Sequence, residues 1–340
     1  MIKKYLPYLL IVIVVFLAAG IFIDSNLKNG SEPILSLTNN KNSMGAELKN
    51  FGQAPEFSGI ANWLNSDAVT MQNLRGKVVL IDFWTYSCIN CIRTLPYVTK
   101  WYDTYKDEGF VVIGVHTPEF EFEKVTENVQ TAIKRYGINY PVAQDNSFST
   151  WNAYKNRFWP AEYLIDKNGQ IVYRHFGEGN YDITENTIRG LLGLNEPADV
   201  TNPAQGNVRS PEIYFGLDRL EYLSLDQVAN MGGGLEYKLP ESLPLNRFAL
   251  AGFWEFHADR IESLDKSKIR LHFFAGKVFM VASAKKSITL KIQVDGVNQP
   301  DVTVNESKLY PLFDSEDYKE HTIDIDIPES GLEAFTFTFG

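Results

Sequence analysis

Short apolar runs alternate with mixed polar and charged stretches between residues 51 and 194. The β-branched and aromatic runs 78–84 and 110–115 predict two buried strands, each followed by a stretch with the pattern of a helix. The first strand is followed by a helix that carries Cys91 and ends at about residue 107, and the second by a helix over 119–137. The remaining elements expected here are a short strand at 140–143, a helix around 148–156, a hairpin of 162–166 and 170–175, and a helix near 183–193. Strands separated by helices indicate an α/β sandwich.

The pattern changes after residue 211, where short strands follow one another without helices. The segment His321–Ile327 alternates polar and apolar residues, which is typical of a strand with one buried and one wet face. Other strands are expected at 248–256, 268–274, 278–284, 288–294, 301–304, 322–327 and 334–339. This pattern predicts an all-β sandwich, jelly-roll-like in type.

The first residues form a different kind of segment. Residues 5–23 are apolar and carry no charge, a stretch long enough to span a bilayer as a helix. Lys3 and Lys4 precede it, so the positive-inside rule leaves the N-terminus in the cytoplasm and the rest of the chain outside. A cleaved signal peptide ending near Ala18-Ala19-Gly20 is the alternative. Either way, the body of the protein is expected in a compartment that permits disulfides.

The predicted organisation follows from these patterns and from two segments rich in Asn, Ser, Gly or Pro. It consists of a membrane anchor (1–23), a flexible linker (24–50), an α/β domain (51–195), a second linker (196–211) and a β-sandwich (212–340). The chain has 340 residues, 44% of them hydrophobic, which is enough for two domains with cores. A net charge of −10 argues against a nucleic-acid partner.

Cys88 and Cys91 are the only cysteines of the chain, and they fall where a buried strand should turn into a helix. Free backbone N–H groups and the helix dipole favour the thiolate of the first cysteine in such a pair. We therefore expect Cys88 to attack a disulfide and Cys91, one helical turn later, to resolve the mixed disulfide.

Other uses of the pair fit the sequence less well. A structural zinc site needs four ligands, but there is no second cysteine pair and the five histidines show no ligand spacing. A structural disulfide across so few residues would restrict the unfolded chain only weakly. We expect no metal and no cofactor besides the redox-active disulfide itself.

The chain resembles the thioredoxin fold in several residues around the cysteines. Phe83-Trp84 precede the pair, Asp82 lies six residues before Cys88, and Pro160 precedes a predicted strand. The resemblance implies that Asp82 is a buried acid that accepts the proton of Cys91 through water, and that Pro160 is cis and exposes the backbone of Trp159 to a substrate strand. The alternatives are a strand-end Asp82 bonded to backbone and a trans proline that merely opens an edge strand.

Further strings narrow the resemblance. Residues 82–91, 116–119 and 159–166 look like those of the TlpA-like and redoxin branch, and like the C-terminal extracytoplasmic region of DipZ proteins, over residues 51–340. This implies a membrane-tethered oxidoreductase of the bacterial envelope, acting on protein thiols and disulfides, with a carbohydrate-binding-module-like sandwich that has a glycan as a possible ligand. DipZ proteins also carry a multi-helix membrane domain, so a separate CcdA/DsbD-like electron donor is expected.

Several residues are weaker candidates for binding. Trp84, Tyr86, Trp159 and Glu119 could line the substrate cleft, although acids such as Glu119 also start solvated helices. A glycan platform would use aromatic rings of the second domain, namely Tyr214, Trp254, Phe256, Phe273 and Tyr310. Core packing is the alternative for these rings.

The main hypothesis is a membrane-anchored, extracytoplasmic thiol–disulfide oxidoreductase. Ile89-Asn90 between the cysteines leaves the direction of electron flow open, with a reductant preferred over an oxidant. One alternative is a redoxin-like antioxidant peroxidase, which Thr85 fits, although Ile81 stands where peroxiredoxins have proline. The other is an envelope adaptor whose sandwich binds a glycan or a protein.

Overall fold

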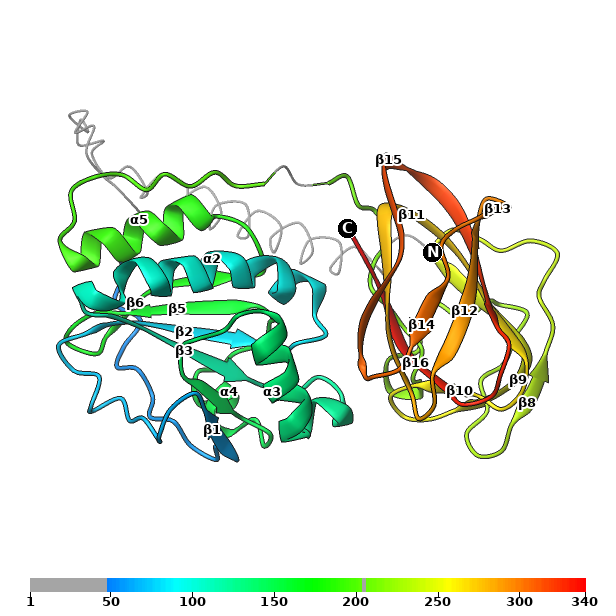
Figure 1. Ribbon diagram of the computed structural model, residues 1–340, viewed down its shortest axis with the longest axis horizontal. Coiled ribbons are helices and arrows are strands. Elements are labelled where there is room, and N and C mark those ends of the chain that lie inside the picture. Colours follow the sequence, from blue (N-terminus) through cyan, green and yellow to red (C-terminus); the bar gives the residue numbers. More distant parts are fainter. Residues whose placement is uncertain (1–47, 204–205) are drawn as a thin grey trace, which may run out of the picture. The chain divides into compact units, whose positions relative to one another are not determined.

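The computed structural model describes residues 48–203 and 206–340 (Figure 1). The predicted anchor at 5–23 and nearly all of the predicted linker 24–50 lie outside these residues. Within the described ranges, no helix has both the length and the apolar character needed to cross a bilayer.

The N-terminal half is an α/β domain built on one mixed sheet. The sheet order is β1-β4-β3-β2-β5-β6, in which β2, β3 and β4 are parallel and the other pairs antiparallel. The strands are β1 (Asn62–Leu64), β2 (Val78–Trp84), β3 (Phe110–His116), β4 (Val142–Gln144), β5 (Ala161–Ile165) and β6 (Ile171–Phe176). Every residue of β2 is buried, which agrees with a sequence that is apolar except for Asp82.

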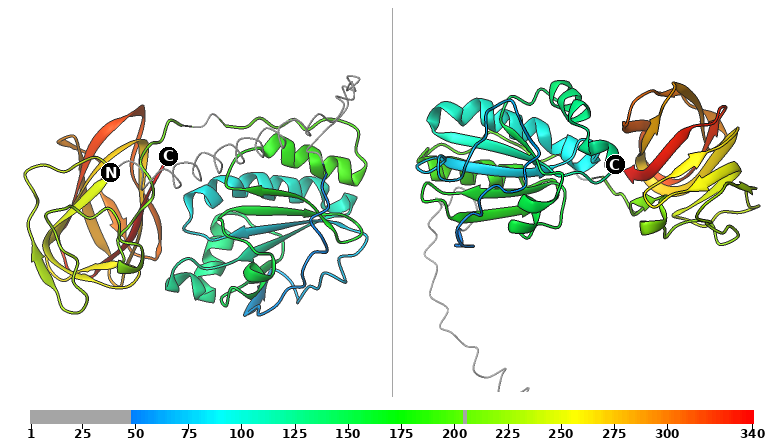
Figure 2. Two further views of the ribbon diagram at one scale, coloured as in Figure 1. Left: turned by 180° about the vertical axis from the view of Figure 1, so that it is seen from behind. Right: turned by 90° about the horizontal axis from the view of Figure 1, so that it is seen from below.

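Helices cover both faces of this sheet. They are α2 (Ile89–Tyr105), α3 (Thr126–Arg135), α4 (Ser149–Ala153) and α5 (Tyr181–Leu192), with short 3-10 turns η2 (Lys106–Glu108) and η3 (Glu121–Lys124). Val98, Ile133 and Ile188 bring α2, α3 and α5 onto the face that also carries Leu80. The segment before β2 and the helix α4 pack on the opposite face. The left view of Figure 2 shows α2 (cyan) and α5 (green) on the same side of the strands.

The helix expected over 119–137 is not continuous. It consists of η3 and α3, separated by Val125 in an extended conformation. The carboxylate of Glu123 accepts hydrogen bonds from the backbone N–H groups of Glu119 and Phe120, which closes a tight turn before the helix. The acids at the start of this segment therefore shape a turn, which helical periodicity does not reveal.

The C-terminal half is β-rich. Its strands are β7 (Ile213–Tyr214), β8 (Leu235–Tyr237), β9 (Arg247–Phe256), β10 (Ile261–Ser263), β11 (Ser267–Ala284), β12 (Ile288–Val294), β13 (Val297–Asn298), β14 (Val302–Val304), β15 (Lys308–Ile327) and β16 (Leu332–Phe339), with the 3-10 turn η4 (Leu217–Arg219). The strands expected at 268–274 and 278–284 are one long strand, β11. Gly276 does not end it, because a register shift between Ala275 and Lys277 absorbs the irregularity.

The aromatic platform expected in this half is wrong for four of its five rings. Trp254, Phe256, Phe273 and Tyr310 belong to the buried core of the β-rich domain. They are in the core because they alternate with outward-facing residues along their strands. Tyr214, the fifth ring, is part-buried and its hydroxyl hydrogen bonds to Glu119 and Glu212. Core packing, rather than glycan binding, therefore accounts for the four buried rings.

Candidate active site

The two cysteines lie at the start of α2, at the end of the strand that crosses the middle of the sheet. Cys88 caps the helix, and its Sγ accepts a hydrogen bond from the backbone N–H of Cys91 at 3.3 Å. Both thiols are free, but Cys88 is half-buried whereas Cys91 is buried. Burial, together with the hydrogen bond and charge of Cys88, raises the pKa of Cys91 well above its ordinary value. The accessible thiol is thus the first one, and the shielded thiol needs a proton acceptor before it can react.

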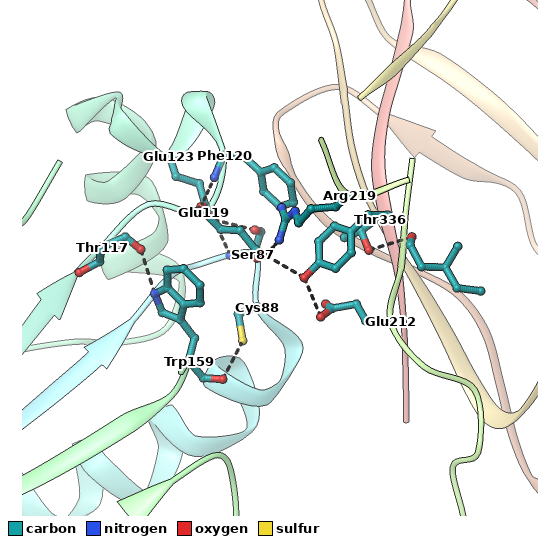
Figure 3. Close-up of polar contacts among 12 residues, drawn as sticks. Ser87, Cys88, Thr117, Glu119, Phe120, Glu123, Trp159, Glu212, Arg219 and Thr336 are labelled. Carbon is teal, nitrogen blue, oxygen red and sulfur yellow. Dashed lines mark hydrogen bonds and ion pairs between the residues drawn. The ribbon is translucent and has the colours of Figure 1, made fainter. Parts of the chain in front are cut away.

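The loop before β5 lies against the first cysteine. The Trp159–Pro160 peptide bond is cis. The Sγ of Cys88 is 4.0 Å from the carbonyl oxygen of Trp159, and the indole Nε1 of Trp159 donates to the carbonyl of Thr117 at 3.1 Å (Figure 3). The fold therefore brings together Cys88, Trp159 and Pro160, which are about 70 residues apart in the chain.

Asp82 lies in the middle of β2 and is buried, with only 1% of its surface exposed. Burial raises the pKa of its carboxyl to about 7. Its Oδ1 has no hydrogen-bond partner among the described residues, so this oxygen is not held by backbone as the strand-end alternative required. The charge of Asp82 also contributes to the raised pKa of Cys91. A carboxyl with a pKa near neutrality beside a buried thiol is suited to accept its proton.

Glu123 is one of three alternating acids for which the sequence favours a solvated helix start over the rim of a groove, but it is buried at the site. Its buried carboxylate accepts a hydrogen bond from the hydroxyl of Ser87 at 2.6 Å, and one from the backbone N–H of the same residue at 3.3 Å (Figure 3). Its second oxygen accepts the backbone N–H groups of Glu119 and Phe120. Glu123 therefore ties the turn after β3 to the residue directly before Cys88. The sequence shows alternating acids at 119, 121 and 123, but it does not show which of them is buried.

Two of the weaker cleft candidates need correction. Trp84 and Tyr86 are buried, with 0% and 1% of their surfaces exposed, so they do not line a surface cleft. Both pack against the ring of His116, Trp84 edge-on and Tyr86 stacked. Trp84 ends a central strand whose two faces are covered, and Tyr86 follows two residues later in the turn before α2. Both rings belong to the same core cluster as Cys91.

Glu119 contacts residues of the C-terminal half of the chain. Its Oε1 accepts hydrogen bonds from the hydroxyl of Tyr214 at 2.8 Å and from Nη1 of Arg219 at 2.7 Å (Figure 3). The guanidinium of Arg219 also lies 3.6 Å from the centre of the Tyr214 ring. This carboxylate is therefore paired rather than solvated. Across residues 48–203 and 206–340, no three His, Cys, Asp or Glu side chains gather as a candidate metal site.

Comparisons with known proteins show which families the chain resembles. The family described as Redoxin matches residues 51–192, and the family described as Thioredoxin like C-terminal domain matches residues 210–340. Protein DipZ of Mycobacterium tuberculosis is 38% identical over 87% of this chain and 44% of its own length, so the chain spans less than half of that relative. The thiol-disulfide oxidoreductase YkuV of Bacillus subtilis is 33% identical over 42% of this chain and 95% of its own length.

Solved structures are also similar. A putative thiol:disulfide interchange protein DsbE from Chlorobium tepidum shares 26% identity over 43% of this chain and 99% of its own, with a TM-score of 0.38.

Proposed function

Because this chain belongs to the family of thioredoxin-like thiol–disulfide oxidoreductases, we propose that it exchanges disulfides with protein substrates through Cys88 and Cys91. One observation carries the proposal: a half-buried Cys88 at the start of α2, against the carbonyl of Trp159, with a buried Cys91 and a buried acid behind it. This arrangement separates an attacking thiol from a resolving thiol.

The reaction runs in two steps. The Cys88 thiolate attacks a substrate disulfide, forms a Cys88–substrate disulfide and releases the other substrate sulfur as a thiolate. The Cys91 thiol then gives its proton to Asp82, and its thiolate attacks Sγ of Cys88. The Cys88–substrate bond breaks, the Cys88–Cys91 disulfide forms, and the released substrate thiolate takes up a proton. Two electrons pass from the protein to the substrate.

We propose that the chain acts as a reductant, so that its reduced cysteine pair reduces the substrate disulfide. The reverse reaction, oxidation of a substrate, would start from the Cys88–Cys91 disulfide. Its electrons would come from a separate CcdA/DsbD-like membrane donor. This direction rests on the family resemblance of residues 51–340, and the chain spans 44% of the DipZ relative. The reaction uses the redox-active pair alone and no further cofactor.

The proposed location is the bacterial cell membrane, with one N-terminal span, a cytoplasmic N-terminus and extracytoplasmic domains. The uncharged apolar residues 5–23 behind Lys3 and Lys4 support this topology. The C-terminal domain would be a jelly-roll-like sandwich that either supports the α/β domain or binds a partner. A glycan ligand there would have to use residues other than the four buried rings.

The proposal is tested with the full chain and a peptide that contains one disulfide. Cys88→Ser is expected to abolish exchange. Cys91→Ser is expected to accumulate a mixed disulfide, seen by mass spectrometry as one added peptide that dithiothreitol removes. Thr104→Ser, on an exposed position of the same helix, serves as the matched control and should keep the wild-type rate. Wild-type exchange by Cys88→Ser would overturn the proposal, and wild-type behaviour of the double serine variant in the cell envelope would favour the adaptor.

A further inference from the structure

Three titratable side chains form one row across the sheet of the α/β domain. Asp82 on β2 is the register partner of Glu162 on β5, and Glu162 is the register partner of His175 on β6. Directly paired residues of antiparallel strands project to the same face, with Cβ atoms about 5 Å apart. The row therefore starts beneath the cysteine helix and ends on β6, which is an edge strand of the sheet.

Each member of the row has a buried polar atom without a hydrogen-bond partner in the described part of the chain. These atoms are Oδ1 of Asp82, Oε1 of Glu162 and Nε2 of His175. The other oxygen of Glu162 accepts a hydrogen bond from the hydroxyl of Thr184 on α5 at 3.2 Å. Buried polar groups usually find partners, so three free atoms in consecutive register positions call for an explanation.

The surroundings of the row hold few charges. The titratable groups that face it are Cys91 from α2, Tyr140 from the segment before β4, Tyr173 from β6 and Tyr181 from α5. None of them is basic. Burial, and then the charge of Asp82, raises the pKa of Glu162 to about 8, while burial lowers the pKa of His175. Glu162 therefore holds a proton more tightly than a free glutamate, and the imidazole at the end of the row gives up a proton more readily than a free histidine.

We propose that Asp82, Glu162 and His175 form a proton relay that carries the proton of Cys91 from beneath the active site to the edge of the sheet. This inference rests on the proposed exchange function. Register partners on neighbouring antiparallel strands have Cβ atoms about 5 Å apart, and one ordered water can bridge polar side chains at such positions. The proton leaves Sγ of Cys91 for Asp82, a proton passes from Asp82 to Glu162 and from Glu162 to His175, and the imidazolium releases it to solvent. The reverse order returns a proton to Cys91 when the disulfide is reduced.

Glu162 and His175 act through Asp82 and do not touch the sulfur atoms, so the test needs a readout beyond overall activity. Reduced full chain is mixed with excess disulfide peptide, and the rate of Cys88–Cys91 disulfide formation is followed between pH 5.5 and 9. The variants are Glu162→Gln, which keeps an acceptor for Thr184, and His175→Gln at the half-buried end of the row.

Glu185→Gln is the matched control, because Glu185 is also a buried glutamate of this domain. Its carboxylate accepts hydrogen bonds from Nε1 of Trp101 and the hydroxyl of Tyr105, away from the row.

The relay predicts that Glu162→Gln slows disulfide closure about tenfold near pH 7, with the difference shrinking above pH 8 as hydroxide removes the proton directly. His175→Gln should lose about threefold, and the control should keep the wild-type pH profile. A Glu162→Gln profile that superimposes on wild type would overturn the relay and leave the exchange function intact. If that variant does not fold, His175→Gln decides the question by the same comparison.

A second readout does not depend on activity. The carboxyl carbons of Asp82 and Glu162, followed by NMR in the oxidised chain, should titrate as a coupled pair. Glu162→Gln should move the titration of Asp82, whereas Glu185→Gln should not. An Asp82 titration that Glu162→Gln leaves unchanged would contradict the relay. A wild-type chain without exchange activity would count against the proposed function, but not against the relay, because the NMR titration does not depend on exchange.

Discussion

The hydroxyl of Ser87 donates a 2.6 Å hydrogen bond to the buried carboxylate of Glu123, so the residue directly before Cys88 is fixed by an acid 36 positions later in the chain. The same carboxylate accepts three backbone N–H groups. Charge-assisted bonds of this kind are stronger than neutral ones and hold both partners in one geometry. The position of the Cys88 loop thus depends on the turn that follows β3.

Glu123→Gln is expected to destabilise the protein by about 2–3 kcal/mol. An amide has one acceptor oxygen and would turn its NH₂ group toward buried N–H donors, which leaves some of them without partners. The free energy of unfolding is measured by urea titration at pH 7. Glu121→Gln, at an exposed neighbouring acid, should change it by less than about 0.5 kcal/mol. Equal effects of the two substitutions would contradict the role of Glu123.

Asp82 makes stability depend on pH. Its folded-state pKa of about 7 lies above the ordinary value of 3.8, so the folded protein holds this proton more tightly than the unfolded chain. Stability contributed by the protonated acid is therefore present at low pH and is lost as the pH rises from about 4 to above 7. The loss is on the order of 4 kcal/mol for the full shift.

Asp82→Asn removes this contribution. The variant should gain stability relative to wild type when unfolding is measured at pH 8.5, and the gain should shrink at pH 4.5. Asp107→Asn, at an exposed acid of the same domain, is the control for the substitution itself. A constant difference between Asp82→Asn and wild type across this range would mean that Asp82 does not titrate in it.

His116 is expected to stay neutral under physiological conditions. Burial lowers the pKa of its imidazole to about 3, from an ordinary value of 6.5. Its NMR nitrogen shifts should therefore remain constant between pH 5 and 8, whereas the same histidine in urea-unfolded protein should titrate near pH 6.5. Because the unfolded state binds the proton more readily, His116 also makes the fold less stable as the pH falls below about 6.5. A titration of His116 near pH 6 in the folded protein would contradict this account.

Much of the α/β domain could be predicted from the sequence because its strands are short and mostly apolar. The segment 78–84 was predicted as a strand and is β2, and the turn at Asn168-Gly169 joins β5 to β6 as expected. The β-rich domain was harder. Gly276 resembles a strand end, but a bulge keeps β11 continuous, and such a bulge depends on the partner strand rather than on local sequence.

The candidate site likewise contains residues that the sequence predicts and residues that only the structure reveals. Cys88 and Cys91 could be found from their spacing alone, because the chemistry needs two thiols one helical turn apart. The contacts of Glu123 and the proposed relay residues Glu162 and His175 could not, because they depend on which residues face one another across strands or turns. The inward direction of Trp84 and Tyr86 was also missed, since aromatic residues beside an active site can equally well line it or support it from below.

The most direct test of the central claim is a redox titration of the Cys88–Cys91 pair in the full chain against glutathione or dithiothreitol buffers, read by thiol alkylation and mass spectrometry. The account predicts one reversible two-electron transition, with both cysteines changing state together and a midpoint near the thioredoxin end of the range, roughly −270 mV. A midpoint near −120 mV would reverse the proposed direction of electron flow. Cysteines that never pair, or that react independently with the buffer, would contradict the claim that they form a redox switch.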